Sequence, residues 1–163
     1  MIFVTVGTHE QPFRRLVEYM DNWAKDHDEE VFIQFGYTDF QAKYAKMQKF
    51  LTREEMAQRI SDARIVVTHG GPACYSEVLR AGKIPVVVPR SKKFGEQYDD
   101  HQIEIGREFK KRNNILFVED IDKLGETIEH YDELSKDMDP SACHSNNNEF
   151  CAHLNQIVDQ MFQ

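Results

Sequence analysis

The sequence has no long hydrophobic segment and no recognisable export signal. No apolar run in its 163 residues approaches the roughly 20 residues that a membrane span requires. The opening segment, MIFVTVGT, lacks the basic region and the small-residue cleavage site of a signal peptide. We therefore expect a cytoplasmic protein.

Basic residues are in the minority. The chain has 20 Lys and Arg against 28 Asp and Glu, which gives a net charge of −8. Binding to nucleic acid or to anionic lipid depends on a surface rich in Lys and Arg. We therefore expect no nucleic acid as a partner and no direct electrostatic adsorption to a lipid surface.

Cysteine is also scarce. The three cysteines, Cys74, Cys143 and Cys151, show no disulfide-framework spacing, and an odd number fits a reducing compartment. His144 and His153 lie near the last two cysteines, but the spacing matches no common zinc pattern. We favour free thiols and assign no metal.

Short apolar runs alternate with amphipathic segments along most of the chain. Strands are expected at 2–6, 31–35, 65–68, 84–88 and 115–118, with an ambiguous strand at 44–50. Helices are expected at 13–23, 52–60, 72–81, 100–111 and 120–128, the second of them opened by a capping box from Thr52 to Glu55. This alternation predicts an α/β fold with a doubly wound, mostly parallel, Rossmann-like sheet.

The C-terminal part differs in composition. We expect a Rossmann-like domain at 1–131, a polar connector at 132–148 and an amphipathic helix at 149–163. The apolar stripe of that helix comprises Phe150, Leu154, Ile157, Val158, Met161 and Phe162. The stripe packs on its own domain, the interpretation that we favour, or it is shared with a partner.

The stretch VVTHGGPACYSE, which runs from Val66 to Glu77, places two glycines between a strand and a helix. Gly70 and Gly71 allow the backbone to approach an anion, and the helix N-terminus offers unpaired N–H groups. In a doubly wound sheet, ligands bind where the strand order reverses, which would bring Gly7-Thr8-His9 to the same crevice. A phosphate or diphosphate fits this turn; a purely structural tight turn is the alternative.

Glu77 follows within the same helix. A carboxylate at this position can accept hydrogen bonds from vicinal hydroxyls, as acidic residues do for ribose in dinucleotide sites. The alternative is a surface ion pair with Arg80. The first turn, GTHEQP, lacks the GxGxxG fingerprint, so NAD is disfavoured.

The segment PRSKKFGEQYDDHQ follows the strand at 84–88 and should reach the same edge of the sheet. It supplies cations first, Arg90, Lys92 and Lys93, and then hydroxyl-binding groups, Asp100 and Gln102. A solvated loop is the alternative for the cations. A helix N-cap is the alternative for Asp99 and Asp100.

Three stretches together resemble the donor-binding half of a GT-B glycosyltransferase, of the glycosyltransferase family 28 C-terminal domain type. They are MIFVTVGTHEQPFRRLVEYMDNW, VVTHGGPACYSEVLRAGKIPVVVPR and FGEQYDDHQIE, within about residues 1–130. The chain is most similar to the small subunits of bacterial capsular or exopolysaccharide galactosyltransferases. It also resembles the catalytic subunit of the eukaryotic dolichol-linked N-acetylglucosaminyltransferase.

The resemblance implies a UDP-sugar donor that is held without an obligatory metal or other cofactor. It implies that His69 stabilises the departing diphosphate, with a structural hydrogen bond as the alternative. Glu77 would bind the ribose, and Asp100, or Asp99 one position earlier, would contact sugar hydroxyls with Gln102. The remaining expected donor contacts are Gly7, Thr8, His9, Gly70, Gly71, Pro72, Ala73 and Arg90.

The family's split enzymes imply a function and a partner. This chain would be the catalytic subunit that transfers a hexose, of galactose or N-acetylglucosamine type, to a lipid-diphosphate-linked sugar in polysaccharide biosynthesis. A membrane-anchored subunit would bind the acceptor and hold this chain at the inner membrane face, with the terminal helix as a possible docking element. The alternatives are a non-catalytic nucleotide-sugar adaptor and a free-standing sugar-nucleotide enzyme, although no acid/base pair here has convincing spacing for the latter.

Overall fold

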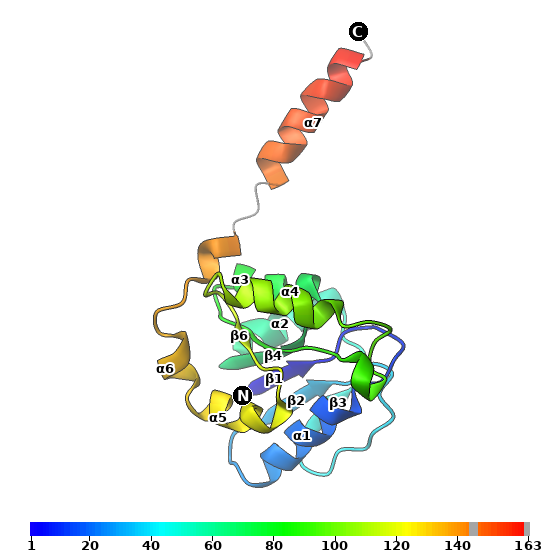
Figure 1. The fold of residues 1–163 in the computed structure, drawn as a ribbon, viewed down its shortest axis with the longest axis vertical. Coiled ribbons are helices and arrows are strands. Elements are labelled where there is room, and N and C mark those ends of the chain that lie inside the picture. Colours follow the sequence, from blue (N-terminus) through cyan, green and yellow to red (C-terminus); the bar gives the residue numbers. More distant parts are fainter. Residues whose placement is uncertain (144–146, 162–163) are drawn as a thin grey trace.

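A computed structural model describes residues 1–143 and 147–161 (Figure 1). In this part of the chain, six parallel strands form one sheet in the order β3-β2-β1-β4-β5-β6. The strands are β1 (Ile2–Thr5), β2 (Val31–Gln34), β3 (Lys46–Gln48), β4 (Ile65–His69), β5 (Val86–Val88) and β6 (Leu116–Phe117). The doubly wound α/β fold is confirmed, and the ambiguous segment at 44–50 contains a strand.

Helices cover both faces of the sheet (Figure 1). They are α1 (Arg14–Lys25), α2 (Arg53–Asp62), α3 (Pro72–Arg80), α4 (His101–Lys110), α5 (Leu124–Glu129), α6 (Tyr131–Ser135) and α7 (Asn147–Met161). On one face Leu16 of α1 packs in the same core as Val4 of β1. On the other, α2 and α3 supply Ile60 and Val78 to a core around Phe3. The strands are buried on both sides, which explains why their sequences are apolar without alternation.

Local signals in the sequence account for several element ends. The capping box is present: the Thr52 N–H donates to Oε2 of Glu55 at 2.7 Å, and the Glu55 N–H donates to Oγ1 of Thr52 at 3.1 Å. The segment after β5 contains a 3₁₀ turn, Lys92–Phe94, which ends at Gly95 with a φ of 70°. Two further 3₁₀ turns are Ile121–Lys123 and Pro140–Cys143.

The segment expected to be a loose connector, 132–148, is ordered in its first part. Tyr131 at its border is buried, and its hydroxyl donates to the Ile84 carbonyl at 2.7 Å. Met138 packs against the main core. The division into 1–131, 132–148 and 149–163 stays a prediction, and residues 144–146 and 162–163 lie outside the described residues.

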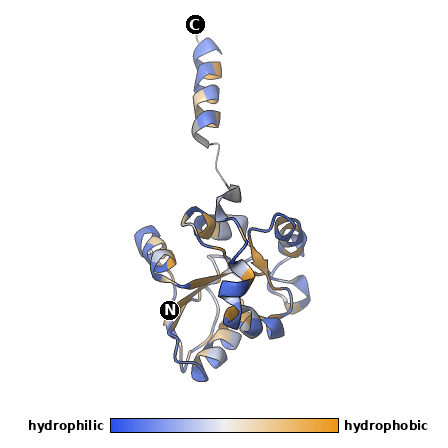
Figure 2. Cartoon of the chain, turned by 90° about the vertical axis from the view of Figure 1, so that its left-hand side faces the viewer, coloured by the Kyte–Doolittle hydropathy of each residue, from blue (hydrophilic) through white to orange (hydrophobic). Residues whose placement is uncertain are grey.

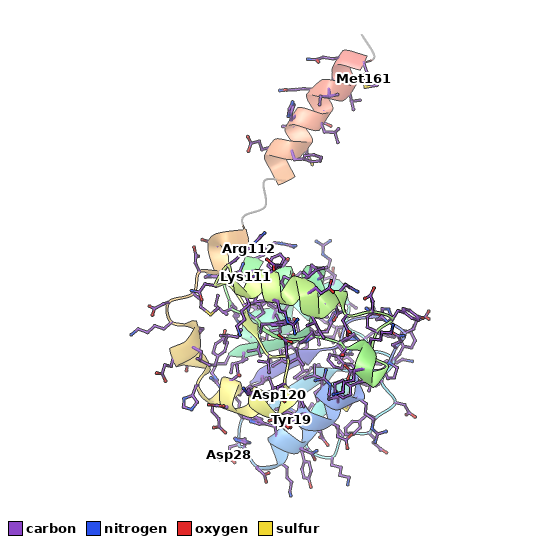
Figure 3. The ribbon with its side chains drawn as sticks, viewed as in Figure 1. Tyr19, Asp28, Lys111, Arg112, Asp120 and Met161 are labelled. Carbon is purple, nitrogen blue, oxygen red and sulfur yellow. The ribbon has the colours of Figure 1, made fainter. Side chains whose placement is uncertain are left out.

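Helix α7 projects away from the sheet and its covering helices (Figure 1). Figure 2 shows apolar bands between polar ones along it, and Met161 lies near its far end (Figure 3). The stripe is exposed: Phe150 by 59%, Leu154 by 46%, Ile157 by 45%, Val158 by 41% and Met161 by 73%. The favoured expectation that this helix packs on its own domain is therefore not met. Within the described residues, no helix is long and apolar enough to cross a membrane.

Candidate functional site

A cleft of about 790 Å³ opens at the carboxyl edge of the sheet, where β1 and β4 lie side by side. The strand order reverses between these two strands, which is where ligands bind in doubly wound sheets. The cleft brings together predicted residues from two distant loops: Gly7, Thr8 and His9 after β1, and His69 and Ala73 around the β4–α3 turn. The predicted meeting of these loops is confirmed.

A second hollow of about 410 Å³ lies between α2 and α3, and Glu77 lines it together with Arg80. It shares two lining residues, Leu51 and Met56, with the cleft. Glu77 is exposed, and among the ion pairs of residues 1–143 and 147–161 none joins it to Arg80. The carboxylate is therefore available to a ligand that extends from the cleft past Leu51.

His69, at the end of β4, explains two of the glycines around the cleft. A Cβ atom at Gly7 would lie 2.5 Å from Cε1 of the imidazole, and one at Gly71 would lie 2.4 Å from its Nε2. Gly7 also has a φ of 75°, a backbone angle that residues with a side chain rarely adopt. Both loops can approach each other only because they lack side chains where the His69 ring lies.

The environment of His69 sets its charge. Burial, and secondarily the positive charge of Arg90, lower the pKa of His69 to about 4. The ring is therefore neutral near pH 7 and brings no positive charge to a diphosphate. Its Nε2 lies 3.9 Å from Sγ of Cys74, a thiol whose pKa burial and the charge of Glu77 raise to about 11. His69 can contribute a single N–H hydrogen bond at most, alongside its role in loop packing.

The N-terminus of α3 supplies the polar groups of the turn. Gly71 is the N-cap and Pro72 occupies the first turn, so no side chain caps the first N–H groups. The Cys74 N–H bonds the Gly71 carbonyl at 3.0 Å, and Ala73 lines the cleft. An anion in the cleft would meet the positive end of this nine-residue helix.

Arg90 does not lie where the sequence led us to expect it. Its side chain is fully buried and lies over the Phe13 ring, 4.9 Å from the ring centre. Its guanidinium donates to the carbonyls of Val6 at 2.9 Å, Gln11 at 2.7 Å and Glu96 at 3.1 Å. These bonds occupy the guanidinium N–H groups that would otherwise bind a phosphate. Direct contact between Arg90 and a donor therefore does not fit this structure.

The acidic pair before α4 lies beside the cleft but not in its lining. The Asp100 carboxylate accepts from the Ser91 hydroxyl at 3.1 Å and from the Lys92 N–H at 2.9 Å. Asp99 instead accepts from the His101 N–H at 3.2 Å and from the His101 ring. Asp100 occupies the N-cap position of α4 without bonding the helix by its side chain, so its carboxylate fixes the preceding turn.

Gln102 is buried and joins two loops. Its Oε1 accepts from the Arg90 N–H at 3.0 Å, and its Cβ lies 2.8 Å from where a Cβ at Gly70 would stand. Gly70 therefore makes room for Gln102, as Gly71 does for His69. The structure supports packing roles for Gly70 and Gln102, and the sugar contact expected of Gln102 stays a prediction.

Sequence reasoning missed Gln34, which lies in the floor of the cleft. Its Oε1 accepts from the Thr5 hydroxyl at 2.6 Å, and its Nε2 donates to the carbonyls of Gly7 at 3.1 Å and Lys49 at 3.0 Å. One amide thus links the carboxyl ends of β1, β2 and β3. The sequence signal that could have identified it is the polar Gln34 at the end of the otherwise apolar strand β2.

Known proteins resemble this chain in sequence or in fold. The UDP-N-acetylglucosamine transferase subunit ALG13 of Yarrowia lipolytica is 28% identical over 141 residues, which cover 77% of this chain and 68% of that protein. The solved glycotransferase of kitacinnamycin matches 83% of this chain with a TM-score of 0.62 and 18% identity. The glycosyltransferase VinC, solved in complex with dTDP, matches 98% of it with a TM-score of 0.61 and 15% identity.

The two solved structures share the fold, and the chain spans only part of each, 35% of the first and 41% of the second. The model of the glycosyltransferase family 28 C-terminal domain matches almost the whole sequence, from residue 1 to residue 157. That range contains both loops of the cleft and the helix that carries Glu77. The chain therefore belongs to the glycosyltransferase family 28 C-terminal domain family.

Proposed function

We propose that this chain is the UDP-sugar-binding, catalytic subunit of a two-component glycosyltransferase. It transfers a hexose, of galactose or N-acetylglucosamine type, to a lipid-diphosphate-linked sugar in polysaccharide biosynthesis. One observation carries the proposal: the uncapped N-terminus of α3 lines a cleft that shares Leu51 and Met56 with the hollow lined by Glu77. This arrangement matches an anion joined to a polyhydroxylated group.

The donor would lie along this path. The diphosphate takes the end of the cleft between Thr8 and Ala73, where the N-terminal amides of α3 stabilise its charge. The ribose reaches Glu77, whose carboxylate accepts hydrogen bonds from the two hydroxyls. The base contacts the apolar side chains of Leu51 and Met56, which line both hollows. Binding of a nucleoside diphosphate by VinC supports this assignment.

In the proposed reaction the acceptor hydroxyl attacks the anomeric carbon, the bond from that carbon to the diphosphate oxygen breaks, and UDP leaves. The α3 N-terminus stabilises the negative charge that develops on the diphosphate. The proton of the acceptor hydroxyl passes to a base on the partner. The donor is held without an obligatory metal, so UDP binding should persist in EDTA.

A partner is supported by the Yarrowia lipolytica relative, which is by name a transferase subunit. We propose a membrane-anchored partner that binds the lipid-linked acceptor and holds this chain at the cytoplasmic membrane face. The exposed stripe of α7 offers a docking surface for it.

The test is sugar transfer by the assembled enzyme. The tagged chain is purified from native membranes with its bound partner and supplied with labelled UDP-galactose or UDP-N-acetylglucosamine and extracted lipid acceptor. Transfer that is lost in the Glu77→Ala assembly supports the proposal. Undiminished transfer after this chain is removed would show that it is an adaptor rather than the catalytic subunit.

A further inference from the structure

Arg90 connects the two segments that flank the cleft. Val6 and Gln11, whose carbonyls accept from its guanidinium, bracket the loop after β1 that carries Gly7, Thr8 and His9. The Glu96 carbonyl, which accepts at 3.1 Å, belongs to the segment after β5. Arg90 lies 84 residues after Val6 and 79 residues after Gln11. One buried side chain therefore fixes the distance between two segments that are far apart in the sequence.

The charge of Arg90 is retained despite its burial. Burial lowers the pKa of Arg90 to about 10, which leaves the guanidinium protonated near pH 7. Its backbone N–H is held by Gln102, so the peptide cannot rotate freely. The face of the Phe13 ring, 4.9 Å away, adds a favourable cation–π contact.

A buried carboxylate continues the network. The Glu96 side chain accepts two bonds from Arg15, at 3.0 and 2.9 Å, and one from the Ser91 N–H at 3.0 Å. Arg15 also donates to the Pro89 carbonyl at 3.0 Å. The network thus extends from α1 to the turn after β5, and none of these residues lines the cleft.

We propose that Arg90 is a positioning residue for the donor diphosphate. Its guanidinium holds the loop Gly7–His9 at the separation from the α3 N-terminus that a diphosphate requires. This inference rests on the proposed function, because it assumes a nucleoside diphosphate in the cleft. Since no hydrogen bond or ion pair among the described residues joins Arg90 to Leu51 or Glu77, the nucleoside end of the donor should not depend on it.

The test compares the dissociation constants of UDP and UMP for the full chain and for Arg90→Lys, at a temperature where both are folded. Lysine keeps the charge, but its compact ammonium lacks the planar fork whose two Nη atoms reach carbonyls of both segments. We expect UDP affinity to fall by about tenfold or more, the effect of losing one charged hydrogen bond, and UMP affinity to change less than about twofold. Arg107→Lys, at an exposed residue paired with Glu119, is the matched control and should change neither.

Equal losses for UDP and UMP, or unchanged UDP affinity, would overturn the positioning role. If Arg90→Lys does not fold, Glu96→Gln takes its place, with a smaller loss that is again confined to UDP. A wild-type chain that binds neither nucleotide would contradict the proposed function instead. Hydrogen exchange at Thr8 and His9 would then still test whether Arg90 holds the loop: faster exchange in Arg90→Lys supports this, and unchanged exchange refutes it.

Discussion

A Cβ atom at Gly71 would lie 2.4 Å from Nε2 of His69, closer than non-bonded atoms approach. The backbone of Gly71 has an ordinary φ of −74°, so alanine would be excluded there by the imidazole and not by backbone strain. The second glycine of the turn is therefore required by a neighbouring side chain. This relationship can be tested directly.

Gly71→Ala should destabilise the fold by about 1–3 kcal/mol, the usual cost of overpacking a filled site, and should reduce UDP binding. The free energy of unfolding is measured by urea titration. Asn22→Ala, at an exposed position of α1, is the control for a substitution away from the site and should cost much less. The double variant with His69→Ala should recover part of the loss; strictly additive effects would contradict the contact.

Glu77→Gln should weaken UDP binding by about tenfold to a hundredfold, because hydrogen bonds from hydroxyls to a carboxylate are stronger than those to an amide. Stability should be unaffected, since Glu77 is exposed. Isothermal calorimetry measures the affinity, and Glu126→Gln, exposed on α5, is the matched control. A folded variant with wild-type affinity would remove Glu77 from the site.

Stability should fall as the pH drops from about 6.5 to about 4. Burial lowers the pKa of His69 from 6.5 to about 4, so in this range the unfolded chain binds a proton that the folded chain does not. The contribution is fully present above pH 6.5 and amounts to at most about 3 kcal/mol. Urea titrations at pH 7 and pH 5 measure it.

The same titrations on His69→Gln isolate this residue from the carboxylates. Glu29, for example, has a pKa lowered by its hydrogen bond to Arg64, so it loses stabilisation at lower pH in both proteins. The variant should lose less stability between pH 7 and pH 5 than the wild type. Equal losses, or an NMR titration of the His69 ring with a midpoint near 6.5, would contradict a buried neutral imidazole.

The thiols should differ in reactivity. Burial and the nearby Glu77 charge raise the pKa of Cys74 to about 11, whereas Cys151 on α7 is exposed. A thiol reagent at pH 7.5 should therefore modify Cys151 well before Cys74, because the thiolate is the reactive form. Mass spectrometry of digested samples follows both sites. Modification of Cys74 at the faster rate would refute its burial.

Removal of α7 should leave the domain intact. Its apolar stripe is exposed, so a chain ending at residue 143 should melt within about 2 °C of the full chain, less than the shift expected for a loss of 1 kcal/mol. UDP affinity should also be unchanged. A decrease of many degrees would show that the helix packs on its own domain in solution, the interpretation that the sequence favoured.

Periodicity and capping signals predicted most of the fold. The runs Ile2–Thr5 and Ile65–His69 were identifiable because strands buried on both faces are continuously apolar. The Thr52 capping box set the start of α2. The short strand Lys46–Gln48 was ambiguous because it lies at the edge of the sheet. Its residues are exposed or only partly buried, so its sequence lacks the continuous apolar run of the central strands.

The site was only partly predictable. The sequence indicated that the loops after β1 and β4 meet, because topology dictates which strand ends are neighbours. It could not show that Arg90 points inward, since its partners Val6 and Gln11 lie 84 and 79 residues away. Gln34 was missed for the same reason: its role depends on contacts across three strands rather than on local pattern.

The cleft between β1 and β4 should bind UDP. The most direct measurement is a thermal-shift titration of the full chain with UDP, UMP, GDP, ADP and NAD, because a ligand of the folded state raises the melting temperature by mass action. We expect a rise with UDP that is larger than with any other nucleotide and that is reduced in Glu77→Gln. A larger rise with NAD or ADP, or a response to UDP that Glu77→Gln does not change, would contradict it.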